Sequence, residues 1–432
     1  MTAPAELTLE GPAPLRGRLR VPGDKGISHR ALLFAALATG TSQVVGLADG
    51  DDVARTRAAL EALGVDITEV AGGGIAVHGA GVESLSEADV VLDCANSGTT
   101  LRMAAGLLAG RPFHAVLSGD EALNRRPMRR VVDPLRAMGA RVDGRDDARY
   151  PPLAIRGGPL VGTRHELGVP SGQVKTALLL AGLQAAGTTT IVEPARSRDH
   201  SERMLAALGA PIERPTPTTV EIRAGVPDPF ELVVPGDPSS AAFFAVAAAV
   251  TPGSELVIED LALNPTRIGF VDVLARMGAE IAVLPRDERL GEPVGDLTVR
   301  FGPLVGTTVD ADEGLIDEIP VLAVAAAFAD GVTEFRGVAE LRVKESDRLA
   351  TLEVELTRLG IGVETGPDRL VVRGGQPRSA RLDSHGDHRI AMAAAVAANA
   401  LAGSSTVGGW SAVGASYPRF DADLAAVTGR SP

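Results

Sequence analysis

The sequence predicts an α/β protein built from six similar repeats, arranged as two domains of three repeats each. Two observations predict this fold class. A short pattern that ends one helix and begins a strand recurs about every 70 to 80 residues, and six alanine-rich apolar runs recur at the same interval. A duplicated Val-Pro-Gly-Asp segment then divides the repeats into two sets of three.

The helix-ending pattern is Leu-x-x-[Leu/Met]-Gly-x-x-[Ile/Val]. It occurs at Leu60–Ile67, Leu135–Val142, Leu205–Ile212, Leu274–Ile281 and Leu356–Val363. In each copy we expect the glycine to end an amphipathic helix, because glycine adopts the left-handed conformation found after helix C-termini. A looser copy at Leu424–Gly429 has no strand after it. The strand-like segment Leu7–Val21 is expected to supply that strand, which would bring the two ends of the chain together.

The apolar runs predict buried helices. Each ends in glycine, and the six are Ala31–Gly40, Leu101–Gly110, Ala177–Gly187, Ala241–Gly253, Ile319–Gly331 and Ile390–Gly403. They are apolar on all sides, which is typical of a helix in the interior rather than on the surface.

The two Val-Pro-Gly-Asp segments indicate where the chain passes between the domains. They lie at Val21–Asp24 and Val234–Asp237, 213 residues apart (234 − 21), which is three repeats. We therefore expect one domain over residues 22–234, and a second that combines 1–21 with 235–432.

Composition narrows the class of protein. The net charge of −13 argues against a general nucleic-acid-binding or anionic-membrane surface, and the single cysteine, Cys94, suits a reducing compartment. The first residues show no basic and apolar stretch of the kind found in signal peptides. The apolar runs fall short of the roughly 20 residues that a membrane span needs. We expect a soluble cytoplasmic protein without nucleic-acid or membrane partners.

Polar residues gather at the starts of the expected buried helices, where exposed N–H groups and the helix dipole favour anions. The groups are Lys25, Ser28, His29, Arg30; Asn96, Ser97, Thr99, Arg102; Ser171, Gln173, Lys175; Asp237, Ser239, Ser240; Asp317, Glu318; and Asp387, His388, Arg389. Helix capping is the alternative interpretation, and we assign it to Asp237, Ser239 and Ser240. Capping does not explain the cations, because a basic residue at a helix start is unfavourable unless an anion compensates it.

Other common sites are not supported. No phosphate-binding Gly-x-x-x-x-Gly-Lys-Ser/Thr occurs, and no dinucleotide-binding Gly-x-Gly-x-x-Gly follows a clear strand. His385 and His388 resemble a metal-binding pair, but no third ligand is evident and Arg389 would repel a cation. We expect no metal and no cofactor.

Eight segments, in order, resemble those of the 5-enolpyruvylshikimate-3-phosphate (EPSP) synthase family, the 3-phosphoshikimate 1-carboxyvinyltransferases. They are PGDKGISHRALL, NSGTTLR, RRPM, PSGQVK, SRDHSERM, IDEIPVLAVAAAF, RVKESDRL and DHRIAM. The resemblance implies two similar domains of three βαβαββ units each, forming inside-out α/β barrels or prisms, with the active site in the cleft between them. It also implies a monomer.

The implied reaction moves the enolpyruvyl group of phosphoenolpyruvate to the 5-hydroxyl of shikimate 3-phosphate and releases phosphate. Phosphoenolpyruvate would be bound by Lys25, Asn96, Gly98, Arg126, Gln173, Arg348 and Arg389. Shikimate 3-phosphate would be bound by Lys25, Gly26, Arg30, Ser171, Gly172, Gln173, Arg198, Asp317 and Lys344. Both substrates are polyanions, which accounts for the cations at the helix starts.

The implied chemistry is addition followed by elimination through a tetrahedral intermediate. Asp317 is the candidate base for the hydroxyl, and Glu345 and Lys25 are the candidates for moving the proton of the methylene carbon. Lys344 and Arg348 are expected to lower the pKa of Glu345, which disfavours it as an acid until an anionic substrate arrives. The division between Glu345 and Lys25 stays open.

Two positions depart from the family pattern, and three other functions stay open. Gly26 stands where the family usually has a serine, which removes a hydroxyl from the shikimate site, and Ala415 stands where some members have a lysine. The alternatives are a transferase acting on UDP-N-acetylglucosamine, one acting on another hydroxylated acceptor, and a non-catalytic polyanion-binding protein.

Overall fold

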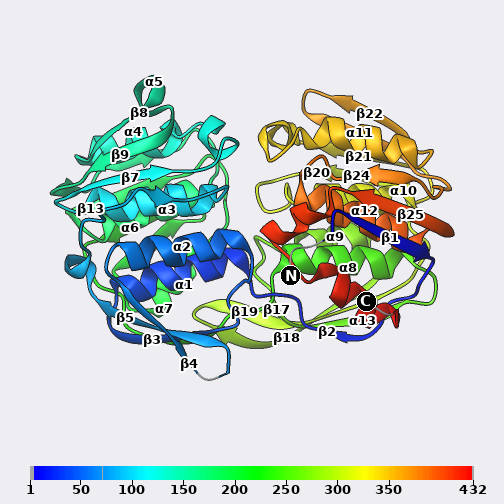
Figure 1. Ribbon diagram of the computed structural model, residues 1–432, viewed down its shortest axis with the longest axis horizontal. Coiled ribbons are helices and arrows are strands. Elements are labelled where there is room, and N and C mark those ends of the chain that lie inside the picture. The colour runs from blue at the N-terminus through cyan, green and yellow to red at the C-terminus, as the bar shows by residue number, and fades with distance from the viewer. Residues whose placement is uncertain (1–3, 71, 431–432) are drawn as a thin grey trace. The chain divides into compact units, whose positions relative to one another are not determined.

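The structure, a computed structural model that describes residues 4–70 and 72–430, consists of two compact units of mixed α/β structure (Figure 1). The N-terminal unit contains Gly23–Val234 and the short segment Glu288–Glu292. The C-terminal unit contains the chain up to Pro22, Pro235–Asp287 and the chain from Pro293 onward. The chain therefore passes from one unit to the other within both Val-Pro-Gly-Asp segments.

In the described part of the N-terminal unit, each repeat has one buried helix and one amphipathic helix. The buried helices are α1 (Lys25–Leu37), α3 (Gly98–Ala109) and α6 (Gly172–Gly182); the amphipathic helices are α2 (Asp51–Ala62), α4 (Arg129–Met138) and α7 (His200–Ala207). A short helix, α5 (Arg145–Ala148), follows the strand β8.

Each of these repeats also has a four-stranded sheet, in which one parallel pair is extended by two antiparallel strands. In spatial order the first sheet is β16 (Glu231–Val233), β3 (Thr39–Val45), β5 (Gly74–Ala80) and β4 (Asp66–Val70). The second is β6 (Leu92–Asp93), β7 (His114–Ser118), β9 (Tyr150–Arg156) and β8 (Arg141–Gly144). The third is β11 (Arg164–Glu166), β13 (Thr188–Val192), β15 (Thr219–Arg223) and β14 (Ile212–Thr216), and β10 (Leu160–Val161) pairs with β12 (Ala185–Ala186).

The C-terminal unit repeats this order of elements. Its buried helices are α8 (Pro238–Val250), α10 (Ile319–Ala327) and α12 (His388–Ala400), and its outer helices are α9 (Gly269–Arg276), α11 (Arg348–Arg358) and α13 (Phe420–Thr428). One sheet is β2 (Arg16–Leu19), β17 (Glu255–Ala262), β19 (Glu292–Arg300) and β18 (Glu280–Arg289). The next is β20 (Thr308–Asp310), β21 (Val332–Arg336), β23 (Arg369–Arg373) and β22 (Gly362–Gly366). The last is β24 (Arg381–Asp383), β25 (Gly403–Gly408) and β1 (Glu6–Gly11).

The strand expected from the N-terminus is confirmed in part. Glu6–Gly11 forms β1 in the last sheet, but β1 does not take the place of the strand that directly follows the outer helix in the other repeats, such as β4 or β22, and Arg16–Leu19 forms β2 in a different sheet. β1 pairs antiparallel with β25, with Glu6 opposite Gly408 and Gly11 opposite Gly403. It therefore occupies the position that β5 and β23 occupy in their sheets. β1 and α13, near the two ends of the chain, belong to the same unit (Figure 1).

The two crossings exchange a strand between equivalent sheets. β2 precedes α1 in the chain but pairs in parallel with β17, which follows α8. Conversely, β16 precedes α8 but pairs in parallel with β3, which follows α1. One sheet in each unit is thus completed by a strand, β2 or β16, that directly precedes a Val-Pro-Gly-Asp segment in the chain.

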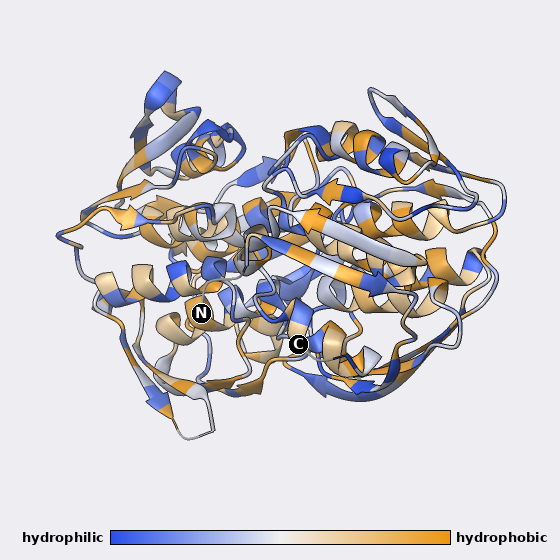
Figure 2. Ribbon diagram, turned by 45° about the vertical axis from the view of Figure 1, so that its right-hand side comes forward, coloured by the Kyte–Doolittle hydropathy of each residue, from blue (hydrophilic) through white to orange (hydrophobic). Residues whose placement is uncertain are grey.

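The apolar runs form buried helices, as predicted. Every residue of α8 is buried, and hydrophobic residues dominate the interior helices in Figure 2. Small side chains let these helices approach closely: a Cβ at Gly106 of α3 would lie 2.1 Å from the carbonyl oxygen of Ala177 in α6. The glycines of the helix-ending pattern are also as predicted, with φ of 88° at Gly64 and 84° at Gly360. None of the helices described here is both long and apolar enough to span a membrane.

One buried helix contains a histidine that makes stability depend on pH. His29 of α1 is fully buried, its Nδ1 lies 2.7 Å from Thr56 Oγ1, and burial lowers its pKa from 6.5 to about 3. As the pH falls below 6.5 the unfolded chain takes up a proton that the folded chain excludes, so the stabilisation present above pH 6.5 is lost toward pH 3. We expect the free energy of unfolding of His29→Asn to fall less steeply with acidification than that of the wild type, by about 1.4 kcal/mol per pH unit between about pH 4 and 6.

Thr56→Val is the control, because it removes the hydrogen bond to His29, together with one to Thr100, but no titrating group. Both variants should be less stable than the wild type at pH 7, and urea unfolding at several pH values separates them. A wild-type pH slope in His29→Asn would show that this imidazole does not titrate as described.

Candidate active site

The buried helices begin with side chains that cap their first N–H groups. Asp24 Oδ1 accepts from Ile27 N at 2.7 Å, Ser97 Oγ accepts from Thr100 N at 3.2 Å, and Asp237 Oδ1 accepts from Ser239 N at 2.8 Å. The capping interpretation is therefore confirmed for Asp237 and wrong for Ser239 and Ser240, which lie inside α8. The Ser239 hydroxyl instead donates to Glu318 Oε1 and accepts from Arg267 Nη2 at 3.0 Å. One cap accepts from only one of the first N–H groups of a helix. It does not account for the cations that lie beside these helix starts.

The structure places the predicted site residues in two clusters, one in each unit. The N-terminal cluster consists of Lys25, Gly26, Arg30, Asn96, Gly98, Arg126, Ser171, Gly172, Gln173 and Arg198, and the C-terminal cluster of Asp317, Lys344, Glu345, Arg348 and Arg389.

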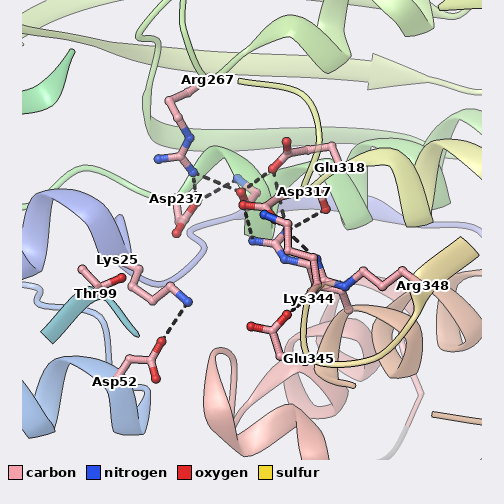
Figure 3. Close-up of polar contacts among 12 residues, drawn as sticks. Lys25, Asp52, Thr99, Asp237, Arg267, Asp317, Glu318, Lys344, Glu345 and Arg348 are labelled. Atoms are coloured by element: carbon pink, nitrogen blue, oxygen red, sulfur yellow. Dashed lines mark hydrogen bonds and ion pairs between the residues drawn. The ribbon is translucent and has the colours of Figure 1, made fainter. Parts of the chain in front are cut away.

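Lys25 is the first residue of α1 and points toward α2. Its Nζ lies 3.0 Å from Asp52 Oδ2, and the side chains of both residues are partly exposed (Figure 3). The α1 N-terminus repels a cation and Asp52 attracts it, so the carboxylate holds an ammonium group at a position that is unfavourable by itself.

Guanidinium groups surround the first turn of α3. Arg126 Nη2 donates to Asn96 Oδ1 at 3.3 Å. A Cβ at Gly98 would lie 2.7 Å from Arg102 Nη1 and 3.4 Å from Arg126 Nη1, so the missing side chain lets both groups approach the helix start. Two guanidiniums beside the positive end of a helix form a site that favours an anion.

The start of α6 connects α3 to α1. Gln173 accepts from Arg102 Nη1 at 2.6 Å and donates to Thr99 Oγ1 at 2.9 Å, which joins α6 to α3. Arg30 of α1 is buried and donates from Nη2 to Thr176 Oγ1 at 2.8 Å and to the Gly172 carbonyl at 3.3 Å. Burial lowers the pKa of Arg30 to about 10, which leaves it protonated at neutral pH.

Arg198 reaches the same helix start from the loop before α7. Ser171 caps α6 by accepting from Val174 N at 3.4 Å. A Cβ at Gly172 would lie 3.2 Å from Arg198 Cβ, so this loop packs directly on the first residues of α6. Contacts within the unit thus link all three helix starts.

Asp317 is the centre of the C-terminal cluster, just before α10. Its Oδ1 lies 3.3 Å from Arg348 Nη1 and 3.5 Å from Lys344 Nζ, and its Oδ2 lies 3.7 Å from Arg389 Nη2 (Figure 3). Glu345 Oε2 accepts from Arg348 Nη2 at 2.6 Å. The Asp317 carboxylate is therefore in contact with three cations, and the Glu345 carboxylate contacts one of them, Arg348.

Arg348 is the most constrained member of that cluster. It is 1% exposed, and its Nε donates to Asp387 Oδ2 at 2.8 Å, an aspartate that is itself fully buried. Burial alone would lower the pKa of Arg348, but the carboxylates of Glu345, Asp387 and Asp317 outweigh it and raise that pKa. Burial likewise acts to raise the pKa of Asp387, and the charge of Arg348 outweighs it, so this pKa is lowered.

Sequence reasoning left out several partners of these residues. Asp52 pairs with Lys25, and Asp387 pairs with Arg348, although neither was assigned to the site. Arg102 was noted at a helix start but not assigned, and it holds Gln173. Asp387 stands in the helix-start group with His388 and Arg389, so the sequence carries a signal for it. Asp52 lies beside another acidic residue in the first turn of α2 and has no such signal.

His385, one of the two histidines that resemble a metal-binding pair in the sequence, contacts a glutamate. His385 Nε2 lies 2.8 Å from Glu355 Oε1. Across the part of the chain that the structure describes, no group of three or more histidine, cysteine, aspartate or glutamate side chains is arranged to hold a metal ion.

Comparisons with known proteins cover nearly the whole chain. A family model described as EPSP synthase (3-phosphoshikimate 1-carboxyvinyltransferase) matches residues 9–424. The chain is 50% identical over 426 residues to a 3-phosphoshikimate 1-carboxyvinyltransferase of Synechococcus sp. (strain WH7803), covering 96% of this chain and 97% of that one. It is also 50% identical over 433 residues to one from Chloroflexus aurantiacus, covering 98% of both chains.

Solved structures give the same picture of the fold. An EPSP synthase from Acinetobacter baumannii superposes with a TM-score of 0.88 at 37% identity, covering 98% of both chains. The enolpyruvyl transferase NikO from Streptomyces tendae superposes with a TM-score of 0.78 over 97% of this chain and 96% of that one. Its identity is 20%, so that likeness concerns the fold alone.

Proposed function

The chain belongs to the EPSP synthase family and has its activity, 3-phosphoshikimate 1-carboxyvinyl transfer, and we propose that its two clusters perform this reaction on one pair of substrates. The activity is assigned because this chain is 50% identical, over nearly its full length, to curated 3-phosphoshikimate 1-carboxyvinyltransferases. The clusters support the proposal because both substrates are polyanions and each cluster gathers cations at helix starts.

The substrate assignments follow the resemblance and are part of this proposal. Phosphoenolpyruvate is bound by Asn96, Gly98, Arg126 and Gln173 of the N-terminal unit, with Lys25, Arg348 and Arg389. Shikimate 3-phosphate is bound by Gly26, Arg30, Ser171, Gly172 and Arg198, with Lys25, Gln173, Asp317 and Lys344. The contact between Asn96 and Arg126, and the packing of Arg198 on Gly172, support these two groupings.

The chemistry begins with deprotonation of the 5-hydroxyl, for which Asp317 is the proposed base. The alkoxide oxygen attacks C2 of phosphoenolpyruvate while the methylene carbon gains a proton, which gives a tetrahedral intermediate. Loss of a proton from the new methyl group then expels phosphate and restores the double bond. Glu345 and Lys25 are the groups proposed to carry that proton, and the binding of Glu345 to Arg348 holds its carboxylate in place.

Gly26 is one of the two positions that depart from the family pattern, and the structure defines the space around it. A Cβ at Gly26 would lie 3.1 Å from Asp24 Oδ1, 3.3 Å from Arg30 Nη1 and 3.5 Å from His200 Cδ2. We propose that the backbone N–H, without a serine hydroxyl, contacts shikimate 3-phosphate, and that Arg30 supplies the charge beside it.

The finer description of the fold is also proposed from the resemblance: each unit is a domain of three βαβαββ repeats that forms an inside-out α/β barrel or prism. The order of helices and strands in each unit supports this description. Action as a monomer, without a cofactor and in the cytoplasm, stays a prediction.

Release of inorganic phosphate tests the proposed function. We expect release only when phosphoenolpyruvate and shikimate 3-phosphate are both present, because phosphate leaves only after the hydroxyl has added to C2. A coupled phosphate assay should give no signal when either substrate is omitted, and none when UDP-N-acetylglucosamine replaces shikimate 3-phosphate. No turnover with shikimate 3-phosphate would contradict the proposal, and turnover with the nucleotide sugar would assign a different acceptor.

A further inference from the structure

A buried ion cluster lies beneath the α6 helix start. Lys175 of α6 is 1% exposed, and its Nζ lies 2.7 Å from Glu193 Oε2 and 2.8 Å from Glu202 Oε1. Glu193 follows β13, and Glu202 lies in the first turn of α7, and both are nearly as buried as the lysine. Lys175 therefore ties α6 to two segments that follow it in the chain.

The two carboxylates make different use of their oxygens. Glu193 uses both: Oε2 accepts from Lys175, while Oε1 accepts from Ser197 Oγ and from Ser171 N, the latter at 3.4 Å. Glu202 Oε1 accepts from Lys175, and its Oε2 has no hydrogen-bond partner among the described residues. Only Glu193 therefore links the lysine to the start of α6 and to the loop before α7.

The balance of charge in the cluster affects the pKa of Glu202. One ammonium faces two carboxylates, so the cluster would carry a net negative charge in a buried position if both were ionised. Burial raises the pKa of Glu202, which outweighs the opposing effect of Lys175.

Both segments that Glu193 contacts contain residues proposed to bind shikimate 3-phosphate. Ser171 is one of them, and Ser197 directly precedes another, Arg198, whose Cβ lies beside Gly172. Resting on the proposed function, we propose that Glu193, held by Lys175, is a positioning residue that fixes Ser171 and Arg198 for shikimate 3-phosphate. Displacements of about 1 Å in groups that orient a substrate are costly to an enzyme, so a buried support of this kind has a measurable effect.

The test compares Glu193→Gln with Glu202→Gln. Glutamine has one acceptor oxygen, so Gln at position 193 cannot accept from Lys175 and from the two serines at once, whereas Gln at position 202 keeps the single contact that Glu202 makes. We expect Glu193→Gln to raise KM for shikimate 3-phosphate about tenfold, with KM for phosphoenolpyruvate changed less than about twofold. Glu202→Gln should leave both KM values within about twofold of the wild type.

The proposal is overturned if the two variants change KM alike, or if Glu193→Gln raises both KM values together. Ser197→Ala keeps the side chains of Lys175, Glu193 and Glu202 and removes one hydrogen bond to Glu193. It is the second test variant if Glu193→Gln does not fold. It should raise KM for shikimate 3-phosphate alone, by about threefold, and unchanged kinetics would also overturn the proposal. Failure of the proposed function is distinguishable, because the wild type would then show no turnover with shikimate 3-phosphate.

Discussion

A Lys25→Arg variant should lose turnover by about 10²- to 10⁴-fold while it keeps its fold. The change preserves the positive charge at the start of α1 and the attraction to Asp52, whose Oδ2 lies 3.0 Å from Lys25 Nζ. It replaces a compact ammonium by a planar guanidinium that does not release its proton in proteins. If Lys25 carries the methylene proton, arginine cannot replace it.

Two further measurements, the kcat of Lys25→Met and the thermal stability of both variants, show why Lys25→Arg loses turnover. Lys25→Met removes both charge and proton, so a loss of kcat similar to that in Lys25→Arg would show that proton transfer, rather than charge, is the essential property. Thermal unfolding should differ little among the three proteins, because the side chain at position 25 is partly exposed. A Lys25→Arg enzyme with most of its kcat would refute the role assigned to Lys25.

The repeats could be predicted because their signals are local. An apolar run such as Ala241–Gly253 is apolar on every side, and a glycine such as Gly64 is needed wherever the chain turns left-handed after a helix. The polar segment Glu288–Glu292 gives no such signal. It belongs to the N-terminal unit, where Glu292 Oε1 lies 2.8 Å from His200 Nδ1 and the Gly291 carbonyl accepts from Arg203 Nη1 at 3.0 Å. These contacts distinguish it from an ordinary surface turn.

The cations at the helix starts could be predicted from the sequence, but the residues that pair with them could not. Lysine occurs only at Lys25, Lys175 and Lys344; the first two lie at the expected starts of buried helices, and the third lies in the RVKESDRL segment. The sequence could not show that Lys175 is held by Glu193 and Glu202, because pairing across segments depends on how the helices pack. The same holds for Arg348 and Asp387, which lie 39 residues apart.

Arg348→Met should lower the free energy of unfolding by about 3–5 kcal/mol, besides weakening the binding of phosphoenolpyruvate. Arg348 is 1% exposed and is the partner of the fully buried Asp387, so its removal leaves a buried carboxylate without its counter-charge. The lowered pKa of Asp387 means that its pairing stabilises the fold above its ordinary pKa and that this stabilisation is lost as the pH falls. Urea unfolding at pH 7 measures the loss.

Arg389→Met is the matched control, because Arg389 is also assigned to phosphoenolpyruvate. It lies 3.7 Å from the side-chain carboxylates of Asp317 and Glu318 and donates from Nη1 to the Asp317 carbonyl at 2.9 Å, so its removal breaks one close hydrogen bond. The removal should cost less than about 2 kcal/mol while it raises KM for phosphoenolpyruvate. Adding Asp387→Asn to Arg348→Met removes the buried charge and should restore part of the stability but none of the activity. Equal stability of the two single variants, or no recovery in the double variant, would show that Arg348 acts on its ligand alone and that the buried pair does not support the fold.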